Sequence, residues 1–405
     1  MSVTANLPIM YPVKGFTLGT ACAGIKVTGR RDLVVMGFDK SATVAGVFTQ
    51  NAFSAAPVQV AKKHLHAGAI QYFVVNTGNA NAGMGEQGLQ DALLTCQALA
   101  DVTNNEITSV LPFSTGVIGE KLAVEKLINA LPEAFNQLSE THWEAAAEGI
   151  LTTDTVAKGA STRLELDGHW VTITGIAKGS GMIRPDMATM LAFIATDAAI
   201  DKGALQKIIK QAVDGSFNKI TVDGDTSTND ACLLVATGTA TAPVIDRVQH
   251  PDYPALHKAI NGVFETLAKA IVLDGEGATK LINIKVDGGA SDEECNAVAY
   301  TIAHSPLVKT AFFASDPNWG RILAAVGRSG VKDLNIDQIE IFLGDICLVK
   351  SGGRAEDYTE EQGQSVMSQK SISVKVDLKR GAYSTEIWTC DLSYDYVKIN
   401  AEYRT

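Results

Sequence analysis

The sequence predicts an α/β protein with mixed β-sheets covered by helices, and three observations favour this class. The chain has 405 residues, of which 46% are hydrophobic, so it is long enough for two or three structural units with their own cores. Its 36 glycines are scattered among strand-like runs, which is not typical of a disordered or fibrous chain. Helical and strand-like segments both occur, and in the last third strands follow one another directly, which disfavours regular βαβ winding.

The individual elements follow from the spacing of apolar residues along the chain. Apolar residues at helical spacing predict helices over residues 88–103, 120–138, 204–213 and 256–272. Short apolar or alternating runs rich in β-branched residues predict strands over residues 72–75, 169–176, 190–195, 231–236, 280–286, 339–342 and 372–376. Two hydrophilic segments, residues 287–294 and 352–365, are interpreted as solvated loops. The alternation in "YVKINAEYRT" predicts a strand that continues to the end of the chain.

Charge and terminal composition exclude several classes of partner. The formal net charge is -11 and the cations form no cluster, so we expect no nucleic-acid partner, because such binding needs a concentrated basic face. The first residues carry no secretory signal pattern, and no apolar run reaches the ~18 residues of a membrane span. We therefore expect a cytoplasmic protein without a membrane partner.

The six cysteines and seven histidines give no metal-ligand pattern. The cysteines lie far apart with no C-x-x-C pair, so buried reduced thiols are expected instead of zinc ligands or disulfides. His64 and His66 are two residues apart and lie on different sides of a helix, and the other histidines are isolated. We expect no metal and no cofactor.

Glycine-rich segments raise the alternative of a non-enzymatic nucleotide- or metal-binding module. "KGSGM" and "LDGEGATK" lack the spacing of a phosphate-binding loop. "VDGDTSTND" begins like a calcium loop but lacks its sixth-position glycine and its distal glutamate. Metal binding by this last segment is therefore disfavoured.

The stretch "KGSGMIRPDMATMLAFIATDA" combines a glycine-rich loop with an apolar strand, and Thr189 lies at their junction. A threonine hydroxyl needs a base to act as a nucleophile, and an N-terminal threonine supplies one through its own α-amine. That amine has a pKa of about 7.7 to 8.0, so much of it is neutral near pH 7.5. Thr189 can have such an amine only if the bond between Ala188 and Thr189 is cut. A β-branched residue that merely opens a strand is the alternative interpretation.

The same stretch strongly resembles the self-processing segment of the glutamate N-acetyltransferase/ornithine acetyltransferase family of arginine biosynthesis. The resemblance covers nearly the whole chain. It recurs in "NTGNANAG", "PFSTGVIGE", "TTDT", "VDGDTSTND", "DGEGATK", "SDPNWGRI" and "DLSYDYVKINAEYRT". It implies a DmpA/ornithine acetyltransferase-like fold, with a smaller C-terminal α/β subdomain over about residues 283–405. It also implies that "VDGDTSTND" forms a hydrogen-bonded turn network near the active site.

The resemblance implies self-cleavage between Ala188 and Thr189, which gives an α chain of residues 1–188 and a β chain of residues 189–405. Thr189 would then take an acetyl group from N-acetylornithine and pass it to glutamate in a ping-pong reaction. The family's oxyanion hole falls on Thr115 and Gly116. Without the family, the "FSTG" segment would be interpreted as a turn.

Substrate-binding positions of the family correspond to Thr152, Lys178, Thr189, Glu276, Asn400 and Thr405. Some members of the family also use acetyl-CoA as the acetyl donor, and members assemble as α2β2 particles. Arg184, Asp186 and Arg404 depart from residues common in other members, without changing the proposed nucleophile. The rival interpretation is an N-terminal-nucleophile amidase or aminopeptidase of the same fold, whose acyl acceptor is water.

Overall fold

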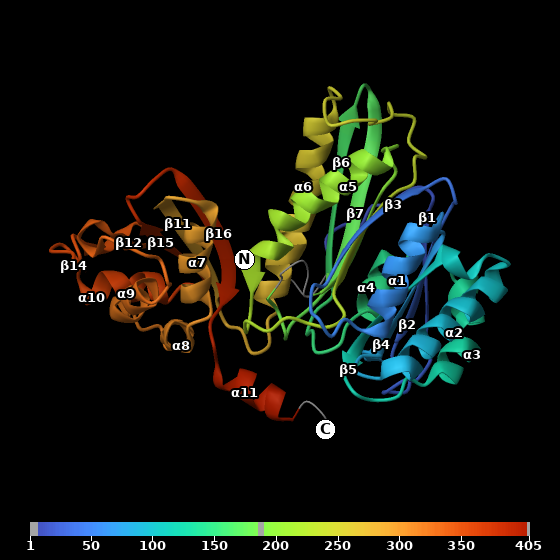
Figure 1. Ribbon diagram of the computed structural model, residues 1–405, viewed down its shortest axis with the longest axis horizontal. Helices are drawn as coiled ribbons and strands as arrows, with labels where there is room; N and C mark the ends of the chain where they lie inside the picture. Colours follow the sequence, from blue (N-terminus) through green and yellow to red (C-terminus); the bar gives the residue numbers. More distant parts are fainter. Residues whose placement is uncertain (1–6, 185–189, 403–405) are drawn as a thin grey trace. The chain divides into compact units, whose positions relative to one another are not determined.

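The computed structural model describes residues 7–184 and 190–402, and these form two compact units (Figure 1). The larger unit contains the described residues up to Asn218 together with Asp225–Ile271. The smaller unit contains Lys219–Gly224 and the described residues from Val272 onward. Both units combine helices with mixed sheets, so the predicted α/β class is confirmed.

The larger unit contains two sheets. The first has four strands in the order β1-β2-β4-β5, with β5 at its edge and parallel to β4. The second has five strands in the order β3-β10-β8-β7-β6, and its central strand β8 lies parallel to β10 and antiparallel to β7. The strands are β1 (Phe16–Ala21), β2 (Leu33–Phe38), β3 (Thr43–Phe48), β4 (Tyr72–Asn79), β5 (Val110–Val117), β6 (Lys158–Leu166), β7 (His169–Lys178), β8 (Leu191–Thr196) and β10 (Ala231–Ala236).

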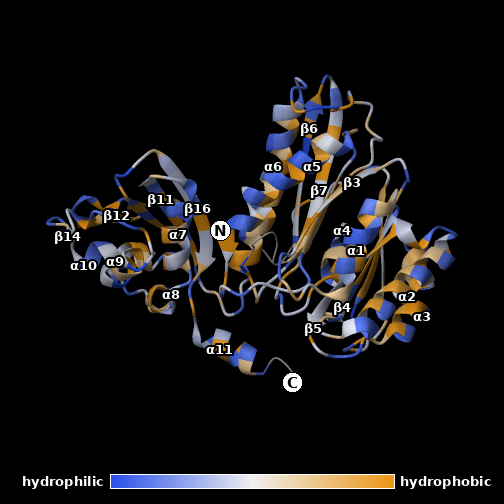
Figure 2. Ribbon diagram, in the orientation of Figure 1, coloured by the Kyte–Doolittle hydropathy of each residue, from blue (hydrophilic) through white to orange (hydrophobic). Residues whose placement is uncertain are grey.

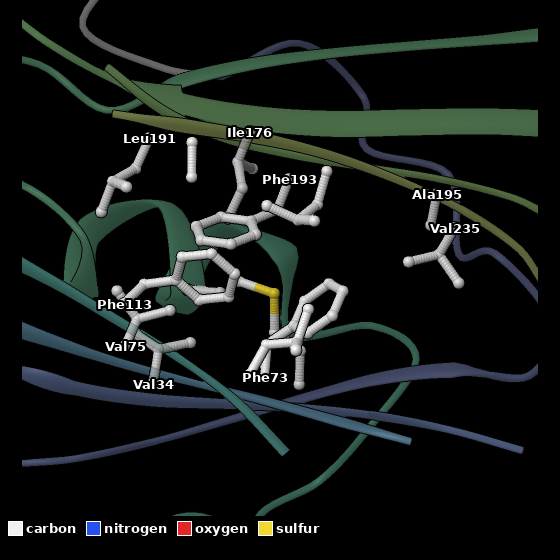
Figure 3. Close-up of a cluster of buried hydrophobic side chains, with 14 of the residues drawn as sticks. Val34, Phe73, Val75, Phe113, Ile176, Leu191, Phe193, Ala195 and Val235 are labelled. Atoms are coloured by element: carbon white, nitrogen blue, oxygen red, sulfur yellow. The ribbon is translucent and has the colours of Figure 1, made fainter. Parts of the chain in front are cut away.

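The two sheets of the larger unit pack face to face. Figure 3 shows Phe73 and Phe113 of the four-stranded sheet facing Ile176 and Phe193 of the five-stranded sheet. The rings of Phe113 and Phe193 meet edge to face with centroids 5.1 Å apart, a geometry that adds to the burial of their apolar area. This shared core fixes the ends of β5 and β7 on facing sheets.

Helices cover the outer faces of both sheets and show one hydrophobic and one hydrophilic side (Figure 2). On the four-stranded sheet, α2 and α3 bury apolar residues in a second core. On the other sheet, α5 contacts β3 and β10, and Leu267 of α6 packs near Gly175 of β7. The helices of the larger unit are α1 (Ala56–Ala67), α2 (Gly85–Thr103), α3 (Val124–Asn136), α4 (Trp143–Gly149), α5 (Lys202–Asp214) and α6 (Tyr253–Leu273), the last ending just beyond the unit boundary.

The smaller unit is built on a seven-stranded sheet in the order β14-β13-β12-β15-β11-β16-β9. One face packs against α7, α8, α9 and α10 in a single core. The other face carries charged residues, among them Asp287, which pairs with Lys285 at 3.1 Å and Lys375 at 3.5 Å. The elements are β9 (Ile220–Thr221), β11 (Leu281–Gly289), α7 (Asp292–Ala303), α8 (Pro306–Phe313), α9 (Trp319–Gly327), β12 (Glu340–Leu343), β13 (Ile346–Lys350), β14 (Gly353–Arg354), α10 (Glu360–Met367), β15 (Ser371–Asp377), β16 (Tyr383–Cys390) and α11 (Tyr394–Ala401).

Three sequence expectations are wrong in the smaller unit. The supposed loop 352–365 contains β14 and the start of α10, which opens with a capping box between Thr359 and Gln362. The supposed loop 287–294 contains the end of β11 and the start of α7, where Ser291 caps the helix. The C-terminal segment forms α11 where a strand was expected, because its apolar residues also fit helical spacing.

Two further expectations are tested over the described residues. All six cysteines are free, but only four are buried, because Cys22 is exposed and Cys347 is partly exposed. No helix in the described ranges is both long and apolar enough to cross a bilayer.

Candidate active site

The S-T-G segment lies at the end of β5, directly against the end of β4. Gly116 has a φ of 135°, and a Cβ added to it would lie 2.3 Å from the carbonyl carbon of Gly78. Only glycine allows both this backbone conformation and this close approach. The two glycines therefore fix the path of the Ser114–Gly116 backbone.

Lys178 connects the second sheet to this segment. It is the last residue of β7, and its Nζ donates a hydrogen bond to Thr115 Oγ1 at 3.0 Å. Thr115 is buried, so this contact places a cationic group beside a buried hydroxyl. Lys178, which is far from Thr115 and Gly116 in sequence, thus lies beside them at the strand ends of the larger unit.

Asp154 is a buried carboxylate that interacts electrostatically with Lys178. The sequence did not identify it as a site residue. Asp154 forms an ion pair with Lys158 at 2.6 Å, with both side chains fully buried, and it accepts a hydrogen bond from the backbone N–H of Gly179 at 2.7 Å. Burial would raise the pKa of Asp154, but the charges of Lys158 and Lys178 and these hydrogen bonds outweigh it and hold the pKa well below its usual range. Thr152 donates its backbone N–H to the same carboxylate at 3.0 Å.

The "VDGDTSTND" segment contributes two buried side chains to the same region. Asn229 donates to backbone carbonyls of two other segments. Asp230 is buried, and its Oδ2 has no hydrogen-bond partner in the described part of the chain. Burial raises the pKa of Asp230 well above its usual range, although a hydrogen bond with Ser227 and the charge of Lys178 act in the opposite direction.

In the smaller unit, two predicted substrate-binding residues meet. Asn400 of α11 donates its side-chain amide to Glu276 Oε2 at 2.8 Å. Glu276 is buried at 7% exposure, whereas Asn400 is exposed. Gly277 follows with a φ of 68°, and its carbonyl accepts a 2.6 Å hydrogen bond from Ser393, which precedes α11. The backbone around Glu276 is therefore tied to the base of α11.

Lys280, at the end of the neighbouring "LDGEGATK" segment, stabilises the fold of the smaller unit. Lys280 donates from Nζ to the backbone oxygens of Phe312 and Met367 and to Ser315 Oγ, at 2.6, 2.7 and 2.6 Å. An ammonium group has three hydrogens to donate, so these acceptors occupy it. Lys280 is therefore committed to the fold of the smaller unit.

The predicted site residues thus fall into two groups. The larger unit contains Thr115, Gly116, Thr152 and Lys178, and the smaller unit contains Glu276 and Asn400. The predicted nucleophile Thr189, its neighbour Ala188 and the terminal Thr405 lie outside the described residues. Met190, the first described residue after this gap, accepts a hydrogen bond from the backbone N–H of Ala231 at 3.0 Å.

Comparison with known proteins gives matches over nearly the full chain. The model of the ArgJ family matches residues 17–405. The chain is 56% identical over 399 residues to the arginine biosynthesis bifunctional protein ArgJ of Pseudomonas fluorescens (strain Pf0-1), covering 98% of each chain. It is 55% identical over 396 residues to the protein of the same name from Methylococcus capsulatus, covering 98% of this chain and 97% of that protein.

Solved structures also match parts of the chain. The crystal structure of arginine biosynthesis bifunctional protein argJ from Bacillus halodurans is 43% identical, covers 51% of this chain and 95% of its own, and has a TM-score of 0.48. Ornithine acetyltransferase of Mycobacterium tuberculosis, solved as a complex with ornithine, is 29% identical, covers 44% of this chain and 94% of its own, and has a TM-score of 0.39.

Proposed function

Because the chain belongs to the ArgJ family and is therefore an acyltransferase of arginine biosynthesis, we propose that it moves the acetyl group of N2-acetyl-L-ornithine to L-glutamate. The products are ornithine and N-acetylglutamate. The observation that carries this proposal is the contact of Lys178 with Thr115 beside Gly116, because it places a cation and a hydroxyl at strand ends above an apolar core. This is the arrangement that a developing oxyanion requires.

The nucleophile is proposed to arise by self-cleavage. Thr189 Oγ1 attacks the carbonyl carbon of Ala188, the carbon–nitrogen bond breaks, and the resulting ester is hydrolysed by water. This leaves a carboxylate on Ala188 and a free α-amine on Thr189, which then serves as the base for its own hydroxyl.

Acetyl transfer then proceeds in two half-reactions through an acetyl-threonine. Thr189 Oγ1 attacks the acetyl carbonyl of N-acetylornithine, and the amine of ornithine leaves with a proton. The amine of glutamate attacks the acetyl-threonine ester and regenerates the hydroxyl. Each half-reaction passes through a tetrahedral oxyanion, for which Thr115 and Gly116 are the proposed donors, and loss of one such donor costs about 10²–10³ in kcat.

The hydrogen bond from Lys178 leaves the hydroxyl of Thr115 able to act as a donor. A hydroxyl accepts through its lone pairs and donates its single hydrogen. Since Thr115 Oγ1 accepts from the ammonium of Lys178, its own hydrogen is available for another acceptor, and the neighbouring charge makes it a stronger donor. Lys178 is also the proposed partner of the substrate α-carboxylate. Thr152, Asn400 and Thr405 are proposed as further substrate-binding residues.

Glu276 is proposed to bind the side-chain amine of ornithine. Its Oε2 accepts from Asn400, and a buried carboxylate is a strong acceptor for an ammonium group. Glu276→Gln removes the charge but keeps the shape, so KM for N-acetylornithine should rise at least tenfold while the glutamate half-reaction changes less. Steady-state kinetics with each substrate varied will check this, and an unchanged KM for N-acetylornithine would remove Glu276 from the proposed site.

Acetyl-CoA is proposed as a second acetyl donor, because the similar proteins carry the name bifunctional. Replacing N-acetylornithine with acetyl-CoA in the assay tests this directly. Formation of N-acetylglutamate supports the second activity, and no product means that the chain only recycles acetyl groups. No further cofactor is proposed.

The ping-pong mechanism has a distinctive test. Incubating the enzyme with N-acetylornithine and isotope-labelled ornithine, without glutamate, should exchange the label into N-acetylornithine through the acetyl-enzyme. A mechanism that needs both substrates bound together gives no exchange. Net hydrolysis of N-acetylornithine at the rate of transfer would instead identify an amidase, whose acceptor is water.

A further inference from the structure

Asn229, two residues before β10, forms three side-chain hydrogen bonds. Its Nδ2 donates to the carbonyl of Ala80 at 2.6 Å and to the carbonyl of Ser114 at 2.9 Å. Its Oδ1 accepts from the hydroxyl of Thr228 at 2.6 Å. The residue is 7% exposed, so each lost bond would leave a buried polar atom without a partner.

The bond to Ser114 acts on the peptide that enters the S-T-G turn. A peptide unit is planar, so fixing the carbonyl of Ser114 also fixes the direction of the N–H of Thr115. Because β5 is the edge strand of its sheet, it has a partner strand on one side only. Asn229 thus supplies a donor from outside the sheet to this strand end.

The same short segment also reaches the start of β8. Two residues after Asn229, the backbone N–H of Ala231 donates to the carbonyl of Met190 at 3.0 Å. Residues 229–231 therefore contact both the S-T-G segment and the strand that directly follows the proposed nucleophile in sequence. The "VDGDTSTND" motif thus has a connecting role that its composition did not show.

We propose that Asn229 is a positioning residue for acetyl transfer, which fixes the Ser114–Thr115 peptide relative to the start of β8. The inference rests on the proposed function, because it gives Thr115 and Gly116 the role of oxyanion donors. Asn229 acts through these residues and needs no contact with substrate. Since misplacement by about 1 Å can cost about 10²-fold in rate, the effect should fall on kcat.

The test compares three variants with the parent enzyme. Asn229→Ala removes both donors and should lower kcat 10- to 100-fold, with KM for both substrates within about threefold. Asn229→Asp is nearly isosteric but directs carboxylate oxygens at two carbonyls. Its activity should be low at pH 8 and recover partly towards pH 6, because a buried carboxyl with a raised pKa regains a proton and donates one hydrogen bond.

Asn51→Ala is the matched control. Asn51 donates to Thr226 O at 3.1 Å in the same turn, and no hydrogen bond joins its side chain to Ser114 in the described part of the chain. It should leave kcat within about threefold of the parent value. Thermal melting of each variant checks folding, and kcat is normalised to the cleaved fraction measured by mass spectrometry.

The outcomes separate this inference from the proposed function. A parent enzyme that transfers acetyl groups, together with Asn229 variants of parental kcat or an equal loss in Asn51→Ala, overturns the positioning role alone. A parent that transfers no acetyl group overturns the proposed function and this role with it. If Asn229→Ala does not fold, the pH dependence of kcat in Asn229→Asp provides the test. A kcat that changes with pH in parallel with the parent's contradicts the positioning role.

Discussion

At the scale of single residues, two buried carboxyl groups near Lys178 have pKa values that are shifted in opposite directions. Asp154 is held ionised by Lys158 and by the N–H of Gly179. Asp230 has one oxygen without a partner in the described chain, and burial favours its neutral form. Their contributions to stability should therefore depend on pH in opposite ways.

Removing the charge of Asp154 should destabilise the fold. Asp154→Asn removes the carboxylate of a fully buried ion pair, and breaking such a pair lowers the unfolding free energy by about 3–5 kcal/mol at pH 7. Because the pKa of Asp154 is depressed in the folded state, its contribution is present above the unfolded pKa of about 3.9 and disappears as pH falls through lower values. Urea titrations of the parent and Asp154→Asn at pH 7 and at about pH 2 measure this difference.

The control for Asp154 is an exposed pair of the same spacing. Lys210 and Asp214 lie 2.8 Å apart with 62% and 46% of their side chains exposed. Asp214→Asn should cost no more than about 0.5 kcal/mol. Equal losses of unfolding free energy in Asp154→Asn and Asp214→Asn would contradict a stabilising role for the buried ion pair.

Asp230 should show the opposite dependence on pH. Its pKa is raised in the folded state, so its contribution to stability is largest below the unfolded pKa of about 3.9 and falls as pH rises through the folded value. Asp230→Asn cannot ionise, so it avoids this loss of stability at high pH. The variant should therefore melt above the parent, and the difference in Tm should be larger at pH 8 than at pH 5. A variant that melts lower than the parent at pH 8 would mean that Asp230 is ionised and paired.

At the scale of elements, the ends of β4 and β5 can approach each other closely because two glycines, Gly78 and Gly116, lie in contact there. Gly116→Ala would force a Cβ to within 2.3 Å of the Gly78 carbonyl carbon at a φ of 135°. We expect loss of acetyl transfer and a destabilisation above about 3 kcal/mol, because neither the backbone conformation nor the space allows a side chain.

Gly262 provides the matched glycine substitution. It is exposed within α6, and a Cβ there would meet nothing within 4 Å. Gly262→Ala should stabilise the protein by about 0.5–1 kcal/mol through helix propensity. Circular dichroism melts and activity assays of both variants test these two expectations. A fully active Gly116→Ala would show that position 116 does not require glycine.

The elements also show what periodicity can and cannot predict. Residues 231–236 match β10, and the helix predicted over 256–272 lies within α6, because both are strongly patterned. β5 was not predicted, since Pro112 interrupts its pattern, and an edge strand tolerates such a proline. The sequence predicts a strand at α11 because the few apolar residues there fit an alternating as well as a helical spacing, and no residue of this short helix is buried.

The site was predictable in part. The family resemblance named Thr115 and Lys178 as site residues, but their contact joins residues 63 positions apart in sequence and follows from the packing of two sheets. Asp154 and Asn229 lie within motifs of the resemblance, but the sequence identifies neither side chain, because their contacts are hydrogen bonds to distant backbone atoms. Such bonds leave no periodic signal in the sequence.

At the scale of the whole molecule, the proposed cleavage would divide one sheet between two chains. In the five-stranded sheet, β3, β6 and β7 would belong to the α chain, whereas β8 and β10 would belong to the β chain. Lys178 of β7 pairs in register with Leu191 of β8 on the far side of the cut. The two chains would interleave within one hydrogen-bonded sheet and could not separate without unfolding it.

The cleaved enzyme should therefore behave as one particle until it is denatured. Native mass spectrometry should show both chains together, in particles whose mass fits the proposed α2β2 assembly, and size-exclusion chromatography in about 6 M urea should release them separately. Chains that separate under native conditions would contradict the shared sheet.

The central claim is that Thr189 becomes an N-terminal nucleophile that carries the acetyl group. Its most direct test is intact-mass spectrometry of the denatured protein, before and after brief exposure to N-acetylornithine, with Thr189→Ala as the control. The account predicts two fragments that meet between Ala188 and Thr189, an acetyl adduct on the fragment beginning at Thr189, and removal of that adduct by glutamate. A parent protein of a single uncut mass, or an adduct on any other residue, would contradict it.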